Sequence, residues 1–383
     1  MDDVVIVSAV RTPFGKRGGV LAGQHSIDLL ATTLVAALDR SGVDPALIGQ
    51  VVGGCVGQVG MQAMNVTRQA WLTAGLPVSV PSTTVDSQCG SSQQAATLAF
   101  ALVKSGMVDA AVACGVEIMS RVPLGANVPR DGSLGKAVTK SYWARHEYTT
   151  QFQAAELIAR KWGVTRADAD ELGVMSQTRA ADAVARGAFE RQVVPVEIHG
   201  ETGAVRVTVD EGLRATTMDG LAALKTNVPD GVHTAGTSSQ VSDGAAAVVL
   251  MSARKAAELG VQPLATIVDS CLVGSDPRLM LTGPISATQL LLSANGMSLA
   301  DIDLVEINEA FASVVLAWQR ELKADMERVN PNGGAIALGH PLGATGAGLL
   351  TKAVHAMVDG DLEHALVTMC CGGGLATGSL LRR

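Results

Sequence analysis

Large aromatic side chains are scarce in this chain, which has four Trp, two Tyr and five Phe in 383 residues. Charged residues are also few, at 17%, whereas hydrophobic residues make up 48% and glycine occurs 42 times. A core with so few rings must be filled by closely packed Ala, Val, Leu and Ile, which favours helices packed on a sheet. The length predicts two or three units of about 150 residues each.

A basic surplus is absent, since the formal net charge is −7. Nucleic acids and anionic membranes both require clustered Lys and Arg, so neither is an expected partner. No apolar run reaches the roughly 18 residues of a membrane span, so we expect no membrane insertion. The N-terminus has no basic region followed by an apolar core, and a cytoplasmic location is therefore expected.

Paired zinc-ligand spacing is missing among the six cysteines, so no metal site is predicted. Their number also does not indicate a dense disulfide framework, and reduced thiols are expected. The cysteines lie at positions 55, 89, 114, 271, 370 and 371.

Strand-like and helix-like segments alternate from the start of the chain, which predicts an α/β protein. The apolar run Val4–Val10 is typical of a buried strand, residues 27–41 have helical spacing, and residues 50–56 form another strand. Residues 41–52 then align with residues 295–306, glycine on glycine and isoleucine on isoleucine, which indicates an internal duplication.

The duplication predicts the domain organisation. We expect residues 1–119 and 241–262 to form one half, residues 263–383 the other, and residues 120–240 an inserted loop domain. In this register Cys89 and His340 occupy equivalent strand-to-helix turns of the two halves. Packing of the halves about a pseudo-twofold axis would bring both residues to one central cleft.

Cys89 is the first candidate for chemistry. An apolar helical pattern runs from Gln93 to Val103, so Cys89 is expected in the first turn of that helix. The helix dipole would stabilise a thiolate there and lower its pKa. By itself the signal is weak, because most buried cysteines only contribute to packing.

Three further positions could act with Cys89. His340 lies within a glycine-rich run that allows close approach of a ligand, and it could serve as a base rather than as a core histidine. Cys370 lies at a strand end, and the glycines that follow Cys371 form a turn whose backbone amides are free to bind an oxyanion. Asn308 follows the strand 304–307, where it could order a water or simply cap a helix.

Four motifs in this order make the chain similar to the thiolase family along its whole length. They are Gln-Cys-Gly-Ser at 88–91, Asn-Glu-Ala-Phe at 308–311, Asn-Gly-Gly-Ala-Ile-Ala-Leu-Gly-His-Pro at 332–341, and Cys-Cys-Gly-Gly-Gly at 370–374. The resemblance implies a duplicated thiolase fold of two αβαβα halves in five layers, with a coenzyme A-binding loop domain. It also implies a homodimer or homotetramer, coenzyme A and acyl-CoA as substrates, and no permanently bound cofactor.

The resemblance also implies a role for each candidate. Cys89 would be acylated, His340 would activate it, and Cys370 would move the proton at Cα of acetyl-CoA. Asn308, through a water, and His340 would hold the enolate oxygen, and the backbone amides of Cys89 and Gly372 would hold the other oxyanion. The reaction would be thiolysis of a 3-oxoacyl-CoA or the reverse Claisen condensation.

Contacts to the substrate are expected from other matching positions. Ser239 matches a serine that contacts the pantetheine arm, and Arg214 is a candidate for the nucleotide end. Phe311 of the second motif and Gln151 are expected beside the substrate, as is Phe152, which stands where many thiolases have glycine. In this departure the chain resembles thiolases of actinobacterial lipid and steroid breakdown.

Two alternatives remain open from the sequence. A ketoacyl synthase shares the duplicated layers, but it needs a second histidine where this chain has Cys370. A thiolase-like protein that binds acyl-CoA without turnover would keep the pocket but not the reaction.

Overall fold

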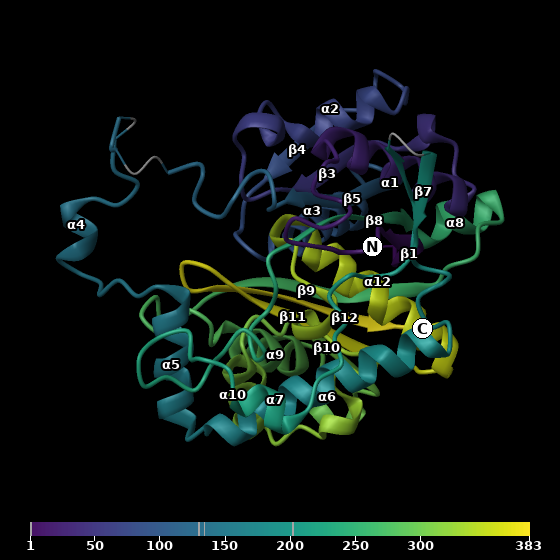
Figure 1. Ribbon diagram of the computed structural model, residues 1–383. Coiled ribbons are helices and arrows are strands. Elements are labelled where there is room, and N and C mark those ends of the chain that lie inside the picture. The colour runs from purple at the N-terminus through teal and green to yellow at the C-terminus, as the bar shows by residue number, and fades with distance from the viewer. Residues whose placement is uncertain (1, 129–130, 134, 201–202) are drawn as a thin grey trace.

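The computed structural model describes residues 2–128, 131–133, 135–200 and 203–383. Ten strands form one continuous sheet with two halves, called the first and the second sheet below, which are joined along one pair of strands. Helices pack between these two halves and over the outer face of each, which gives five layers (Figure 1). This arrangement confirms the predicted α/β class and the duplicated fold. None of the described helices combines the length and apolar character that a bilayer crossing requires.

The first sheet follows the order β4-β3-β5-β8-β1. Its strands β3, β4 and β5 are mutually parallel, whereas β8 runs antiparallel to both β5 and β1. Every residue of β1 and β8 is buried, which confirms the buried strand predicted from the apolar run Val4–Val10. The strands are β1 (Val4–Arg11), β3 (Gln50–Gly54), β4 (Ser82–Val85), β5 (Ala110–Ile118) and β8 (Ser242–Ser252), with the short β2 (Gly15–Lys16) paired to β8.

The second sheet follows the order β10-β11-β12-β9, which repeats the first sheet without a counterpart of β4. The two sheets meet where β9 pairs antiparallel with β1 over three residues. Its strands are β9 (Ala265–Gly274), β10 (Leu304–Ile307), β11 (His364–Cys371) and β12 (Leu375–Arg382).

Two helices pack between the sheets, and they are the equivalent helices of the two halves. Helix α3 (Ser91–Lys104) contacts β3, β5 and β12, helix α12 (Leu342–Gly360) contacts β8, β10 and β11, and the two helices contact each other. Because Cys89 and His340 each lie two residues before the first residue of one of these helices, the fold brings both turns to the centre of the molecule.

The outer helices cover the opposite faces of the two sheets. Helices α1 (Ser26–Ser41), α2 (Val66–Thr73) and α8 (Ala253–Leu259) pack on the first sheet, and α9 (Gly283–Ala294) packs on the second. Helix α10 (Ala312–Leu322) lies against α9, α5 and α6, and α11 (Ala335–Leu338) lies against α6.

The segment between β5 and β8 carries its own helices and a small hairpin. Helix α4 stands out from the body of the molecule, as Figure 1 shows, whereas α5 and α6 pack against the second half. The elements are α4 (Lys140–Trp143), α5 (Gln151–Trp162), α6 (Arg166–Ala185), the hairpin of β6 (Val196–Gly200) and β7 (Gly203–Val207), and α7 (Met218–Ala222).

A buried ion pair ties this segment to the first strand. The guanidinium of Arg11 donates to both carboxylate oxygens of Asp210, at 2.6 and 2.9 Å, and both side chains are almost fully buried. The backbone N–H of Phe14 donates to the same carboxylate at 2.7 Å. The end of the inserted segment is therefore held next to the strand that begins the fold.

Candidate active site

Cys89 lies in a tight turn between β4 and α3. Gln88 has a φ of +54°, and its N–H donates to Asp86 Oδ1 at 2.7 Å. The Oγ of Ser91 accepts from Ser87 N–H at 3.0 Å and donates to the carbonyl of Gln88 at 2.6 Å. These bonds fix a left-handed residue directly before the cysteine, where backbone strain is characteristic of functional turns.

The sequence placed Cys89 inside the first turn of the helix, and this expectation is wrong. Gly90 is the N-cap and Ser91 the first helical residue, so the thiol lies just outside α3. Burial raises the pKa of the Cys89 thiol to about 11, against the lowering that the sequence suggested. Two carboxylates, Glu117 and Asp86, oppose the thiolate further, while the N–H groups of Gly372 and of Cys89 itself favour it.

The backbone of Gly372 reaches Cys89 from the turn between β11 and β12. Gly373 and Gly374, which follow it, both have a φ of +78°, a conformation that glycine adopts without steric cost. The N–H groups of Gly372 and of Cys89 itself both favour the thiolate, so both lie beside the sulfur to which an acyl group would be bound.

Cys370 and Cys371 point away from each other, as expected of neighbours in a strand. Cys370 is fully buried in a cluster with Met280 and Phe311, and burial followed by the nearby Cys89 raises the pKa of its thiol well above the usual value. Cys371 lies against Gly90, where a Cβ would come within 2.5 Å of its sulfur. Cys371 therefore packs under the Cys89 turn.

His340 is buried, and its hydrogen bonds determine its tautomer. Its Nδ1 lies 2.7 Å from Thr345 Oγ1, and that hydroxyl donates its only proton to the carbonyl of Pro341 at 2.8 Å. Nδ1 must therefore carry the imidazole proton, which leaves Nε2 as an acceptor. Burial lowers the pKa of His340 to about 4, so the ring is neutral at pH 7.

Asn308 faces the free nitrogen of His340. Its Nδ2 lies 3.5 Å from His340 Nε2, and its backbone N–H donates to Thr368 on the adjacent strand β11. The side chain is fully buried, and its Oδ1 has no partner among the described residues. Helix α10 begins at Ala312 with Phe311 as its N-cap, so Asn308 does not cap that helix.

The Cys89 and His340 groups are joined by a shared apolar contact. Cys89 packs against Val56, Met119 and Leu342, and Leu342 is the second residue after His340. The sequence-predicted residues Cys89, Cys370 and Gly372 thus form one group, His340 and Asn308 form another, and the contact between α3 and α12 brings the two together.

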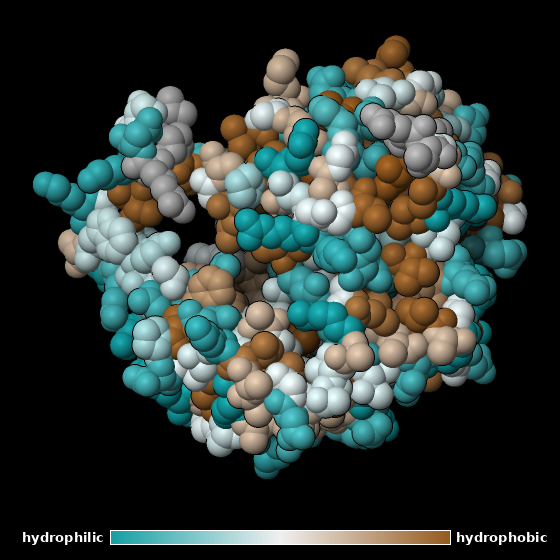
Figure 2. Space-filling view, viewed as in Figure 1, coloured by the Kyte–Doolittle hydropathy of each residue, from teal (hydrophilic) through white to brown (hydrophobic). Residues whose placement is uncertain are grey.

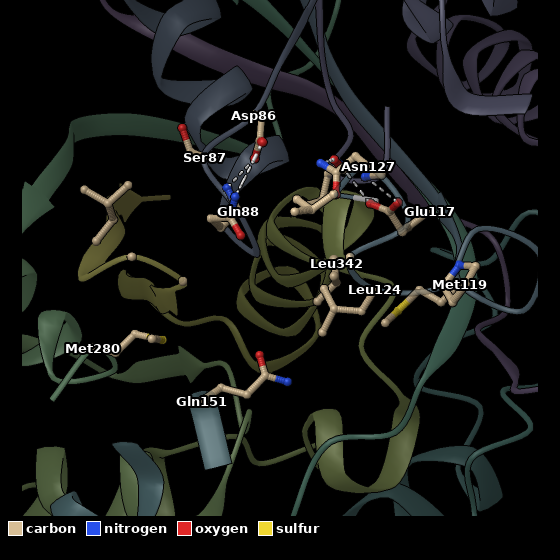
Figure 3. A pocket seen from close by; sticks show the side chains of 18 of the residues that line it. Asp86, Ser87, Gln88, Glu117, Met119, Leu124, Asn127, Gln151, Met280 and Leu342 are labelled. Carbon is tan, nitrogen blue, oxygen red and sulfur yellow. Dashed lines mark hydrogen bonds between the residues drawn. The ribbon is translucent and has the colours of Figure 1, made fainter. Parts of the chain in front are cut away.

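A cavity of about 580 Å³ opens beside these residues. Figure 2 shows this face hollowed next to the segment around α4, and Figure 3 shows Gln151, Leu124 and Leu342 pointing toward a shared space with Glu117 on another wall. Its wall includes the candidate residue Gly372. It also includes Gln88, directly before Cys89, and Leu342, two residues after His340. Acyl-sized ligands therefore have room beside Gln88 and Gly372. The described lining does not include Cys89, Asn308, His340 or Cys370.

Of the residues expected to contact substrate, some line the cavity and others lie outside its described wall. Gln151 lines the cavity, but Phe152 packs edge-on against Phe311, with ring centroids 5.5 Å apart, and is absent from the described lining. Ser239 is half-buried beside the second motif, where its N–H donates to Ala310 at 2.9 Å. Arg214 is exposed and lies outside the described cavity wall.

Sequence reasoning missed two buried groups at the site. Thr345, five residues after His340, orients the imidazole. Glu117, the last residue of a Gly-Val-Glu sequence near the end of β5, accepts hydrogen bonds from four N–H groups beside Cys89, including one from Gln62. A carboxylate at the end of an otherwise apolar strand was the available signal for Glu117, whereas nothing local marked Thr345.

Besides Asp86 and Glu117, the site region contains the carboxylate of Glu309, which belongs to the motif at 308–311. Glu309 accepts hydrogen bonds from Ser176, Asn330 and the backbone of Ile336, so it holds the loops around Asn308 and does not face the cavity lining described above. Among the described residues, no group of three His, Cys, Asp or Glu side chains could hold a metal ion.

Comparison with known proteins agrees with this geometry. The thiolase N-terminal domain matches residues 4–254 and the thiolase C-terminal domain matches residues 261–383. The chain is 44% identical to the steroid 3-ketoacyl-CoA thiolase of Mycobacterium tuberculosis over all of this chain and 95% of that protein. It is 40% identical to the beta-ketoadipyl-CoA thiolase of Acinetobacter baylyi over the full length of both.

Solved structures show the same fold. The acetyl-CoA acetyltransferase of Bacillus anthracis superposes with a TM-score of 0.92 at 36% identity, covering 100% of this chain and 99% of that one. Human mitochondrial 3-ketoacyl-CoA thiolase gives 0.91 at 33% identity with the same coverage. The duplicated layers, the four motifs and the full-length matches together place this chain in the thiolase family of acyltransferase enzymes.

Proposed function

We propose that this thiolase works through an acyl-Cys89 intermediate, in the direction of 3-oxoacyl-CoA cleavage or its reverse. One arrangement carries the proposal: the glycine turn after β11 packs against the Cys89 turn, with Gly372 next to Gln88 and Cys371 beneath Gly90, so that the N–H of Gly372 lies beside the Cys89 thiol. Donors in this position stabilise the oxyanion that forms when a thiolate attacks a carbonyl, and each is worth about 2.7–4 kcal/mol of barrier.

In the first half-reaction the thiol proton of Cys89 passes to His340 Nε2, which is the unprotonated nitrogen. The thiolate attacks the 3-oxo carbon, the bond between C2 and C3 breaks, and the electron pair passes to the enolate of acetyl-CoA. Cys370 then gives its proton to the enolate carbon, which releases acetyl-CoA. The enolate oxygen is held by protonated His340 and by a water on Asn308, whose buried Oδ1 lacks a partner among the described residues.

In the second half-reaction the Cys370 thiolate takes the proton of a CoA thiol. The CoA thiolate attacks the acyl carbonyl, and Cys89 leaves as a thiolate that recovers its proton from His340. Both cysteines thus end protonated, as their raised pKa values favour in the resting enzyme. The cycle uses coenzyme A as a substrate and needs no bound cofactor.

For the substrate, we propose a 3-oxoacyl-CoA with a bulky, ring-bearing acyl group. The relative named a steroid 3-ketoacyl-CoA thiolase supports this class at 44% identity. The cavity of about 580 Å³ supports it too, because both tyrosines of the chain, Tyr142 and Tyr148, line it. Flat aromatic walls pack well against alicyclic rings.

The remaining expectations are proposals of the same kind. Residues 120–240 would form the coenzyme A-binding loop domain between halves formed by 1–119 with 241–262 and by 263–383. Ser239 and Phe311 would lie along the pantetheine arm, and the exposed Arg214 would meet the nucleotide end. A homodimer or homotetramer in the cytoplasm is the assembly and location that we propose.

The covalent intermediate is the first test. Incubation with acetyl-CoA should add about 42 Da to the intact protein, since an acetyl group replaces the thiol hydrogen, and Cys89→Ala should abolish the adduct. Cys271→Ala removes a half-buried thiol on β9 and serves as the matched control, which should acylate normally. An adduct that persists in Cys89→Ala would remove Cys89 from its role.

The substrate class is tested separately by thiolysis of short linear, long linear and ring-bearing 3-oxoacyl-CoA thioesters. We expect the highest kcat/KM with the ring-bearing thioester. Equal or higher kcat/KM with a short linear thioester would contradict the substrate proposal while leaving the reaction intact.

A further inference from the structure

We infer that Glu117 is a positioning residue whose carboxylate holds together the two backbone segments that enclose the Cys89 sulfur. The inference rests on the proposed function, since it concerns how the acylated thiol and its base are aligned. Glu117 touches neither the sulfur nor His340 by a hydrogen bond among the described residues, and it takes no proton in the steps above.

Each carboxylate oxygen of Glu117 accepts two N–H hydrogen bonds, and the Cys55 thiol lies 4.0 Å from Oε1 as a further, weak donor. Oε2 accepts from the backbone N–H of Val56 at 2.9 Å and of Gly343 at 3.0 Å. Oε1 accepts from the N–H of Gly57 at 3.0 Å and from Gln62 Nε2 at 2.6 Å. With 1% of its surface exposed, the side chain has exchanged water for these four N–H donors.

The segments that Oε2 joins are the ones whose side chains surround the nucleophile. Val56 belongs to the loop after β3, and Gly343 is the second residue of α12, directly after Leu342. Val56 and Leu342 both pack against Cys89. One oxygen atom therefore fixes the distance between two walls of the Cys89 pocket, one from each half of the molecule.

The backbone around this oxygen leaves no room for adjustment. A Cβ added at Gly343 would lie 2.8 Å from Glu117 Oε2 and from the carbonyl of Val116, and a Cβ at Gly115 would lie 2.0 Å from the carbonyl of Gly343. The start of α12 thus rests directly on the end of β5, held there by Glu117. Because His340 is three residues before Gly343, displacement of this helix start would also move the imidazole.

The negative charge of Glu117 disfavours the Cys89 thiolate, whereas its hydrogen bonds hold the site in place. Every one of these contacts donates to the carboxylate and so favours its ionised form, against the burial that raises the pKa of Glu117. That negative charge opposes ionisation of the Cys89 thiol. Loss of the charge should therefore make Cys89 more reactive toward an alkylating agent, whereas loss of the alignment should make the enzyme slower.

The test is Glu117→Gln, in which the amide nitrogen would face two N–H donors in place of accepting from them. We expect kcat/KM for thiolysis to fall at least 10-fold, while alkylation of Cys89 by iodoacetamide at pH 7.5 is unchanged or faster. Asp170→Asn is the matched control, because it neutralises another buried carboxylate, on α6, and it should keep kcat/KM within twofold. Turnover of Glu117→Gln within twofold of wild type, or equal falls in turnover and alkylation, would overturn the inference.

Amide hydrogen exchange separates this inference from the proposed function. In Glu117→Gln, peptides that contain residues 55–58 and 342–346 should exchange at least 10-fold faster, and peptides from α6 should not change. Unchanged exchange in both peptides would contradict the positioning role of Glu117 even if the enzyme proved inactive on every thioester. Absence of thiolysis by the wild type with faster exchange in the variant would instead contradict the proposed function alone.

Discussion

The Nδ1 atom of His340 lies 2.7 Å from the Oγ1 atom of Thr345, five residues further along the chain. The threonine hydroxyl donates its proton to the carbonyl of Pro341, so toward the imidazole it can act only as an acceptor. A residue with no part in the chemistry thereby decides that the nitrogen facing Asn308 is the basic one.

Thr345→Val should lower kcat by about 10-fold to 100-fold, because a buried Nδ1–H without an acceptor no longer fixes the tautomer. Thr345→Ser keeps the hydroxyl and should retain activity within threefold. Thr351→Val is the matched control on the same helix, since that hydroxyl donates to Ala347 and is not bonded to His340. Steady-state thiolysis of the four proteins makes the comparison, and equal kcat in Thr345→Val and wild type would contradict the assignment.

His340 should make stability depend on pH in the acidic range. Burial lowers its pKa from 6.5 to about 4, so between these values the unfolded chain binds a proton that the folded chain does not. Its contribution to the free energy of unfolding is complete above pH 6.5 and is lost as the pH falls toward 4, by about 1.4 kcal/mol per pH unit. His355, whose pKa burial also lowers, acts in the same direction.

Urea denaturation at pH 4.5–7.5 measures this dependence, and comparison with His340→Gln gives the contribution of His340 to it. The variant should lose stability less steeply with falling pH than the wild type does. Parallel curves for the two proteins would mean that the imidazole titrates normally in the fold.

Cys89 should react as a protonated thiol in the resting enzyme. Because burial raises its pKa to about 11, the rate of alkylation by iodoacetamide should rise about 10-fold per unit between pH 7 and pH 9. Peptide mapping by mass spectrometry follows the modification at residue 89, and Cys89→Ala supplies the background. A rate that levels off near pH 7 would show a thiolate stabilised by its surroundings.

The buried ion pair of Arg11 and Asp210 should be important for stability. Asp210→Asn leaves the guanidinium, which is fully buried, without its counter-charge, and such a loss costs about 3–5 kcal/mol. Glu258→Gln breaks the exposed pair with Arg254 and should leave the midpoint of urea denaturation unchanged. A midpoint for Asp210→Asn equal to that of the wild type would contradict the prediction.

Local patterns were sufficient to find most of the elements around the site. The strand Val4–Val10 and the helix at 27–41 were predicted within one residue, because buried strands and amphipathic helices have characteristic periodicities. The equivalence of Cys89 and His340 followed from an alignment of the chain with itself. Each of these signals depends on residues that are neighbours in sequence.

The pKa predicted for Cys89 from the sequence is wrong. A position at a helix start suggested a lowered pKa, but burial between Val56, Met119 and Leu342 raises it. The desolvation that decides the sign comes from segments distant in the chain, which no local pattern can supply. Phe152 shows the same limit, because its edge-on contact with Phe311 joins residues that are distant in the chain.

By itself the sequence determined the kinds of reactive group, their order along the chain and the repeat that makes two turns equivalent, because residue type and periodicity are properties of the chain. Only the tertiary structure decided which imidazole nitrogen is basic, which thiols are protonated, and that Glu117 joins the halves beside Cys89. Proton positions and pKa values depend on partners within a few ångströms, and folding alone chooses those partners.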